Sequence, residues 1–178
     1  MRTASRNENN YYNRNKGMNK RDAARIDEQE QRDFDTTKNI LQRLYKNHNT
    51  TFSKMPEFSP SDMRYSVECK SGNTYLYNVE IKSRNQDMNR YNTLPLKVSK
   101  YQRLVADTKD GERLLYVVLL NDYQYFIFDL DRVDFTTIEK RKWKIQLQEF
   151  NEGGSDYIEV PTYFIPAKLA VNNGLIYK

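Results

Sequence analysis

Residues 114–120 form an unbroken apolar run, rich in Leu and Val, that is flanked by charged and polar residues. A strand with one face in water alternates apolar and polar residues, whereas a continuously apolar strand is covered on both faces. The run therefore predicts a central strand with other elements packed on each side of it. Residues 123–130 follow after a tight turn and predict a further strand.

Two earlier segments alternate between apolar and polar residues, as half-buried strands do. Their apolar members are Met63, Tyr65, Val67 and Cys69 in the first segment and Val79 and Ile81 in the second. Antiparallel pairing about a loop at residues 71–73 places both apolar sets on one face, whereas a slip by one residue would invert a strand. This register predicts Asp62 opposite Lys82, with Glu80 on the diagonal, about 5 to 8 Å apart.

Asp62, Glu80 and Lys82 would then place two carboxylates and an ammonium group in one patch. Two close carboxylates repel each other unless a cation lies between them, and Mg²⁺ binds carboxylate and carbonyl oxygens while it keeps several waters. A lysine beside the ion can position the attacking water or neutralise charge that builds on a phosphate. The alternative is a solvated face with a cross-strand ion pair.

At these residues the chain resembles the PD-(D/E)XK nuclease superfamily, whose core has a restriction-endonuclease-like fold. The segment 60–62, Pro-Ser-Asp, lies where the family has Pro-Asp, with the proline one position earlier, and the segment 79–82, Val-Glu-Ile-Lys, matches the Glu-x-Lys strand. The resemblance covers about residues 22–130 and implies an α/β fold, a mixed sheet flanked by helices. One family strand that usually precedes Asp62 is not evident, because residues 50–58 are short and interrupted by proline.

The resemblance implies that Asp62, Glu80 and the carbonyl oxygen of Ile81 bind Mg²⁺ or Mn²⁺, and that Lys82 is the catalytic lysine. The implied activity is hydrolysis of DNA phosphodiester bonds by a metal-activated water, without a covalent intermediate. The alternative is a protein that keeps this fold and binds nucleic acid, or belongs to a virion, without turnover.

Superfamily members often add a Glu from the helix that precedes these strands. Residues 23–47 predict that helix, with an apolar stripe at helical spacing that consists of Phe34, Thr37, Leu41 and Leu44. Glu30 continues the stripe by one turn, and a carboxylate there is unusual unless it is paired or at a site. Asp27 and Glu28 are weaker candidates. The alternative for Glu30 is an acidic residue that the helix dipole favours near the N-terminus.

Members also often use a Lys or Gln from the helix that follows. Residues 94–105 predict that helix, opened near Pro95, with an apolar stripe that consists of Leu94, Val98, Tyr101 and Val105. Lys100 most resembles the family's helix lysine and would contact phosphate, although Lys97 and Gln102 flank the stripe more closely. The alternative is a solvated side chain on an amphipathic helix.

At 178 residues, of which 38% are hydrophobic, the chain suits a single α/β domain rather than two. Residues 1–21 carry much of the formal charge of +5 and predict a disordered basic arm, which binds nucleic acid or remains a solvated tail. Residues 22–130 are the nuclease-like core, and residues 131–178 are a C-terminal extension packed on the core. Within the extension, residues 140–148 predict a strand or edge ribbon, and residues 157–171 predict a lid or closing strand.

Several function classes are excluded. Cys69 is the only cysteine and His48 the only histidine, which rules out a disulfide, Cys/His zinc spacing, and Ser-His or Cys-His catalysis. No apolar run approaches a membrane span, so we expect a cytoplasmic protein with DNA, not a membrane, as its partner. Heavy use of Asn, Lys and Tyr suggests a bacterium or its phage. A homodimer, or a phage or bacterial protein partner, remains open.

Overall fold

The computed structural model describes residues 20–57, 59–146 and 157–176. In these residues a six-stranded mixed sheet has the order β1-β2-β3-β5-β6-β9, and a three-stranded antiparallel sheet has the order β4-β8-β7. The large sheet consists of β1 (Asn49–Lys54), β2 (Met63–Glu68), β3 (Thr74–Arg84), β5 (Glu112–Leu120), β6 (Gln124–Asp129) and β9 (Asn172–Leu175). The small sheet consists of β4 (Thr93–Lys97), β7 (Lys140–Gln146) and β8 (Tyr157–Pro166). This arrangement confirms the predicted α/β class with a mixed sheet.

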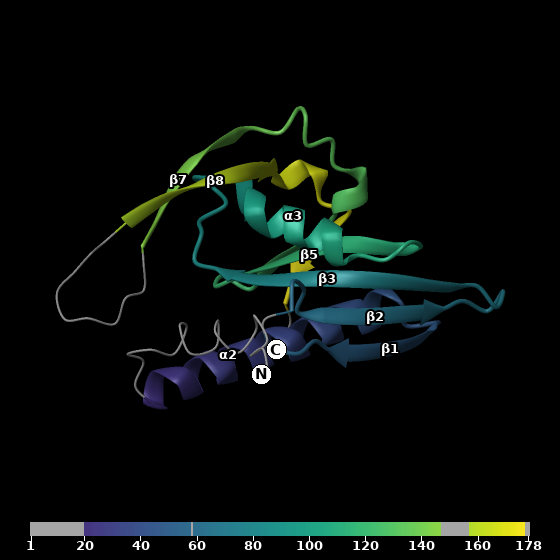
Figure 1. The fold of residues 1–178 in the computed structure, drawn as a ribbon. Helices are drawn as coiled ribbons and strands as arrows, with labels where there is room; N and C mark the ends of the chain where they lie inside the picture. Colours follow the sequence, from purple (N-terminus) through teal and green to yellow (C-terminus); the bar gives the residue numbers. More distant parts are fainter. Residues whose placement is uncertain (1–19, 58, 147–156, 177–178) are drawn as a thin grey trace, which may run out of the picture.

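The two α-helices of the described residues lie on opposite faces of the large sheet (Figure 1). Helix α2 (Lys20–Leu44) packs on one face, and helix α3 (Val98–Asp107) packs with the small sheet on the other. Short 3₁₀ turns follow β6 and β8, at Leu130–Arg132 and Ala167–Leu169. None of the described helices is both long and apolar enough to cross a membrane.

Strand β5 is the centre of the fold and confirms the strand predicted at residues 114–120. All seven of these residues are buried, the odd-numbered ones against α2 and the even-numbered ones against α3. Strand β5 runs parallel to β3 and antiparallel to β6, so it needs a crossover from β3. That crossover contains β4 and α3, which is how Lys100 comes to lie over β3.

Helix α2 begins and ends three residues earlier than the predicted helix at 23–47. It buries Thr37, Ile40 and Leu41, but Leu44 is 41% exposed, so its place in the predicted stripe is wrong. The ring of Tyr45 takes that place in the core because the chain turns after residue 44 and brings it against Tyr65 and Tyr77. Since α2 starts at Lys20, the boundary predicted between residues 21 and 22 falls inside a helix. The predicted arm otherwise lies outside the described residues.

The prediction of helix at residues 94–97 is wrong. These residues form β4, and the helix starts only at Val98. Pro95 is compatible with a strand here because β4 pairs with β8 on one side only, and an edge strand tolerates a missing N–H. Of the predicted stripe, Leu94 and Val98 are buried and Tyr101 is half-buried, but Val105 is 49% exposed and Leu104 is fully buried in its place.

A strand that was not evident from the sequence precedes Asp62. It is β1, at the edge of the large sheet. Its Phe52 ring stacks on Tyr65 at 5.5 Å, while most of its other residues are exposed. An edge strand with a single aromatic residue against the core shows little alternation between apolar and polar residues. The sequence pattern therefore does not predict this strand.

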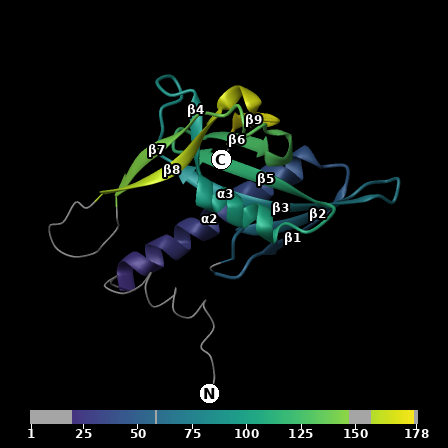
Figure 2. The ribbon, with the colours of Figure 1, turned by 45° about the horizontal axis from the view of Figure 1, so that its top comes forward.

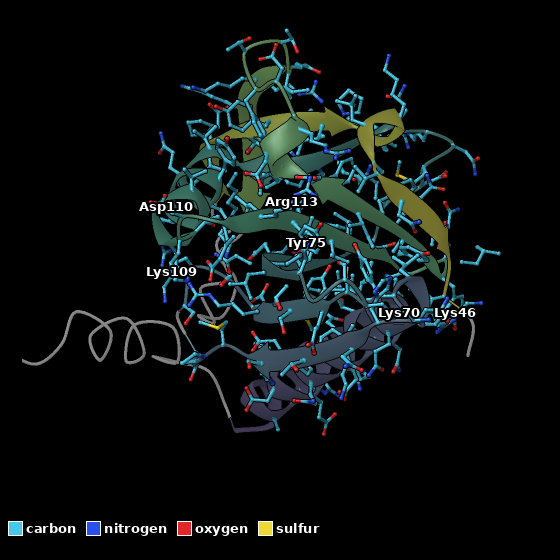
Figure 3. The ribbon with its side chains drawn as sticks, turned by 90° about the vertical axis from the view of Figure 1, so that its right-hand side faces the viewer. Lys46, Lys70, Tyr75, Lys109, Asp110 and Arg113 are labelled. Atoms are coloured by element: carbon cyan, nitrogen blue, oxygen red, sulfur yellow. The ribbon has the colours of Figure 1, made fainter. Side chains whose placement is uncertain are left out.

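The hairpin of β2 and β3 forms on the predicted face but two residues out of the predicted register. Met63 pairs with Val79 and Glu68 with Thr74, so the loop is residues 70–72 and not 71–73. Gly72 explains the difference, because its positive φ of 83° suits the last position of a three-residue loop rather than its centre. Figure 3 views the molecule from the side at which this hairpin ends.

We expect Gly72→Ala to lower the free energy of unfolding by about 1 to 2 kcal/mol, the usual cost of left-handed backbone for an L-residue. A Cβ at this position would meet no atom within 4 Å, so the cost is conformational rather than steric. Chemical denaturation measures it. Gly72→Asn is the matched control and should lose less, because Asn tolerates this conformation. Equal losses for both would mean that contacts, not backbone, fix the loop.

Residues after 131 form β7, β8 and β9. The strand predicted at 140–148 is confirmed as β7 over its described residues, and the closing segment begins with β8, which contains Pro161. The two strands form a ribbon that extends from the body of the molecule (Figure 2). Trp143 on this ribbon is half-buried and contacts Phe164 and Arg84.

Candidate active site

Strand β3 brings Glu80 and Lys82 to the face that α3 covers. Val79 and Ile81, between them, are buried on the α2 side, as predicted. Asp62 lies just before β2, where its N–H donates to the carbonyl oxygen of Val79 at 2.9 Å and its Oδ2 accepts from the N–H of Ile81 at 2.7 Å. In the shifted register Asp62 is level with Glu80, not with Lys82 as predicted. The three side chains nevertheless lie together.

Glu80 is the centre of this group. Its side chain has no exposed surface, while its two carboxylate oxygens contact the ammonium groups of Lys82 at 2.9 Å and Lys100 at 2.7 Å. No described backbone or hydroxyl group donates a hydrogen bond to either oxygen. A buried carboxylate requires positive partners, and here both partners come from lysines that the sequence singled out.

Burial and charge oppose each other at Glu80. Loss of solvent raises the pKa of Glu80 to about 7, and the negative charge of Asp62 adds to that rise, while Lys82 and Lys100 act against it. Glu80 and Asp62 in turn raise the pKa of the Lys82 ammonium group against the opposing effect of its own burial. Two carboxylates are therefore close enough to repel each other, as the sequence predicted.

Helix α3 is tied to β3 at both of its ends. At its start Lys100 contacts Glu80, and at its end the side-chain amide of Asn78 donates to the Thr108 hydroxyl at 3.1 Å. Arg64 on β2 also contacts Asp107 at 3.3 Å. Lys100 is thus positioned by a helix anchored along the same strand that carries its partner.

Asp62, Lys82 and Lys100 line a cleft of about 800 Å³ between α2, the loop after β1, and α3, whereas Glu80 lines the smaller cavity beside it. The walls of the cleft differ in charge. Side chains of α2 supply the acidic residues Asp27, Glu30 and Asp33, whereas Lys82, Lys100 and Arg103 are basic. Lys54 and Glu57 also line the cleft, so its lining carries both signs of charge, which suits a ligand that combines cations with phosphate.

The structure separates the weaker candidates. Glu30 and Asp27 line the cleft, but Glu28 lies outside it and contacts Arg32 at 3.9 Å on the solvent face of α2. Lys97 lines a neighbouring cavity, and Gln102 is exposed and lines neither. Lys100, which most resembled the family's helix lysine, is the one that reaches Glu80.

Sequence reasoning missed two basic residues, Arg84 and Arg103. Arg84 shares the parity of Glu80 and Lys82 along β3, so the alternation of the strand extends to it. Arg103 follows Lys100 by three positions on α3, which brings it to the same side of the helix. Both signals were available in the sequence.

Within the described part of the chain, no group of three or more His, Cys, Asp or Glu side chains is arranged to hold a metal ion. The expected ligand set contains only two carboxylates, with a backbone carbonyl as the third ligand. No protein-family model, curated protein or solved structure matches this chain.

Proposed function

We propose that this protein is a Mg²⁺-dependent nuclease of the PD-(D/E)XK type, with a restriction-endonuclease-like core, that hydrolyses DNA phosphodiester bonds. The observation that carries the proposal is Glu80, a fully buried carboxylate beside Asp62, with Lys82 and Lys100 on its two oxygens. Asp62 and both lysines line the large cleft. A site used only for stability would be better served by apolar packing, because buried ion pairs rarely repay their desolvation.

The residues fit a hard cation. Asp62, Glu80 and the carbonyl oxygen of Ile81 would hold it, since all three offer oxygen. The cation would take the place of the ammonium groups of Lys82 and Lys100, which now contact the two oxygens of Glu80. When bound, Mg²⁺ or Mn²⁺ supplies a Lewis acid and lowers the pKa of water.

The other roles belong to the chain's own groups. Lys82, with 40% of its side chain exposed, faces both the cleft and Glu80, so it orients the attacking water or stabilises charge on the phosphate. Lys100, 22% exposed, contacts phosphate from the opposite side of Glu80. Glu30, on the acidic wall, tunes the cation site from α2.

A second candidate is a nucleic-acid-binding or virion-associated protein that keeps the fold without turnover. The observation that favours it is the ion triad of Glu80, Lys82 and Lys100, because the two ammonium groups already balance the charge of Glu80. Metal binding separates the two candidates. A nuclease binds Mg²⁺ at Asp62 and Glu80, whereas an ion triad does not.

The deciding experiment incubates the purified full chain with linear, circular and branched DNA, and with RNA, in Mg²⁺ or Mn²⁺. Cleavage that EDTA stops supports the nuclease. Absence of cleavage on every substrate, together with absence of metal binding in calorimetry, supports the binding protein.

We expect Mg²⁺ binding to release protons near neutral pH. Since the pKa of Glu80 is about 7, binding should release about 0.9 proton at pH 6 and about 0.1 at pH 8, and the apparent affinity should rise about tenfold between them. Titration calorimetry in buffers of different ionisation enthalpy measures the release. Glu28→Gln should leave it unchanged. Equal release at both pH values would show that Glu80 is not a ligand.

The same shift has a consequence for stability. The folded protein retains a proton on Glu80 at pH values where an unfolded chain, with the ordinary pKa of 4.5, has lost it. This group's contribution to the free energy of unfolding is therefore complete below pH 4.5 and is lost as pH rises through about 7.

A further inference from the structure

A second cavity of about 330 Å³ lies between the end of β3, strand β4 and the start of α3, and Glu80 lines it. Its cationic side chains are Lys82, Arg84, Lys97, Lys100 and Arg103, and Glu80 is its only acidic residue among those described. We call this cavity the basic pocket. The elements that form it are shown together in Figure 2. The proposed chemistry at Asp62 and Glu80 uses Lys82 and Lys100 but leaves Arg84 and Lys97 without a role.

The positive charge of the basic pocket is not balanced within the described residues. Glu80 already contacts Lys82 and Lys100, and neither Arg84 nor Lys97 forms an ion pair with any residue that the structure describes. Burial lowers the pKa of Lys97, and the neighbouring charge of Arg84 lowers it further. Cations gathered in this way repel each other, so an anion in the pocket would be stabilised by all of them.

Contacts with β4 and β7 fix the position of the Arg84 guanidinium group. Its guanidinium carbon lies 5.7 Å from the centre of the Trp143 ring on β7, and its Nη2 donates to the carbonyl oxygen of Pro95 at 3.4 Å. Its Nε is buried and has no described hydrogen-bond partner. The hydroxyl of buried Tyr116 donates to the same Pro95 oxygen at 2.8 Å. This hydrogen bond holds β4 against β5 beside the basic pocket.

The start of α3 adds to the attraction. Ser99 and Lys100, in its first turn, line the basic pocket, and this turn contains no acidic residue and no side-chain cap. Free N–H groups at a helix start favour anions. A guanidinium group and ammonium groups around one cavity match phosphate, which accepts several charge-assisted hydrogen bonds at once.

We propose that the basic pocket binds a phosphate group of the nucleic-acid substrate, adjacent to the phosphate that is cut. Naming the substrate rests on the proposed function, whereas phosphate as the ligand rests on the pocket alone. Because Lys82 and Lys100 line both cavities, the two phosphates would lie on either side of these two lysines. Arg84 and Lys97 are then binding residues, distinct from the groups that act on the scissile bond.

The test measures binding without cleavage. Fluorescence anisotropy of a labelled DNA in EDTA, over a range of salt concentrations, gives the affinity and its salt dependence. Arg84→Gln and Lys97→Met should each weaken binding about tenfold and reduce the log-log salt slope by about 0.7 to 0.9. Lys109→Met is the matched control, because Lys109 is exposed in the turn beyond the far end of α3 (Figure 3), and it should leave both values unchanged.

Two further measurements test whether the ligand is phosphate. Arg84→Lys keeps the charge but loses the planar fork, so it should lose less affinity than Arg84→Gln. Inorganic phosphate at millimolar concentration should raise the melting temperature of the wild type and should raise that of Lys97→Met less. If Arg84→Gln fails to fold because its contact with Trp143 is lost, Lys97→Met carries the test alone.

The outcomes separate this inference from the proposed function. Unchanged DNA affinity and salt slope in folded Lys97→Met would overturn the basic pocket even if the wild type cleaves DNA. Loss of DNA and phosphate binding in that variant, with a wild type that cleaves no nucleic acid, would support the pocket and remove the nuclease. Phosphate stabilisation without any effect on DNA binding would restrict the ligand to free phosphate and overturn the substrate assignment.

Discussion

Glu80→Gln should abolish cleavage, with a fall of about 10³ or more, and should also abolish the stabilisation that Mg²⁺ gives the wild type. The change keeps the shape of the side chain and removes the one buried negative charge in the site. A ligand at 100 times its dissociation constant stabilises a protein by about 2.7 kcal/mol. That gain, measured as a shift in melting temperature on adding Mg²⁺, should disappear together with the activity.

The control for this variant is Glu28→Gln, which changes an exposed carboxylate on the solvent face of α2. It should keep both the activity and the Mg²⁺-dependent shift in melting temperature. The two readouts must change together in Glu80→Gln. A variant that loses cleavage but keeps the full thermal shift would mean that the ion binds elsewhere.

Lys82→Ala should have the opposite pattern in metal binding. Removing a cation that lies 2.9 Å from Glu80 takes away no ligand, so the affinity for Mg²⁺ should be kept or should increase. The cleavage rate should fall by about 10², the scale of losing one group that stabilises the transition state. Calorimetry and single-turnover cleavage measure the two effects separately.

Lys109→Ala serves as the control for Lys82→Ala, because it removes an exposed ammonium group outside the cleft. Its rate and metal affinity should equal those of the wild type. If Lys82→Ala loses metal binding along with activity, then Lys82 supports the position of Glu80 rather than the reaction. If it loses neither, the catalytic role assigned to it is wrong.

The sequence predicted the parts of the site that depend on strand parity. Met63 and Val79 share a face whichever odd-to-odd register is chosen, so Glu80 and Lys82 necessarily share the other. The choice among those registers was wrong because it depends on which loop position needs a positive φ. Only the backbone at Gly72 reveals that the loop ends there.

Contacts between elements were harder to predict. Lys100 was chosen by resemblance, and its 2.7 Å contact with Glu80 depends on where α3 starts. The helical pattern extended into β4 because Leu94 and Leu96 are apolar in either conformation, and pairing with β8 decided between them. Arg84 on β3 and Lys97 on β4 line the same pocket only because of that pairing and the crossover from β3 to β5. No local pattern in the sequence predicts that they lie close together.

Strand β9 makes the order of synthesis matter for this fold. It pairs with β6 through residues that lie about fifty positions later in the chain, from Gln124 with Leu175 to Ile127 with Asn172. Every residue of the candidate site precedes β5, so the site can be complete on a nascent chain while the edge of β6 is still open. That edge presents the unpaired backbone groups of residues 124–127, and open strand edges promote aggregation. Until residues 172–175 have paired with β6, this edge stays open, although every residue of the proposed active centre has already been synthesised.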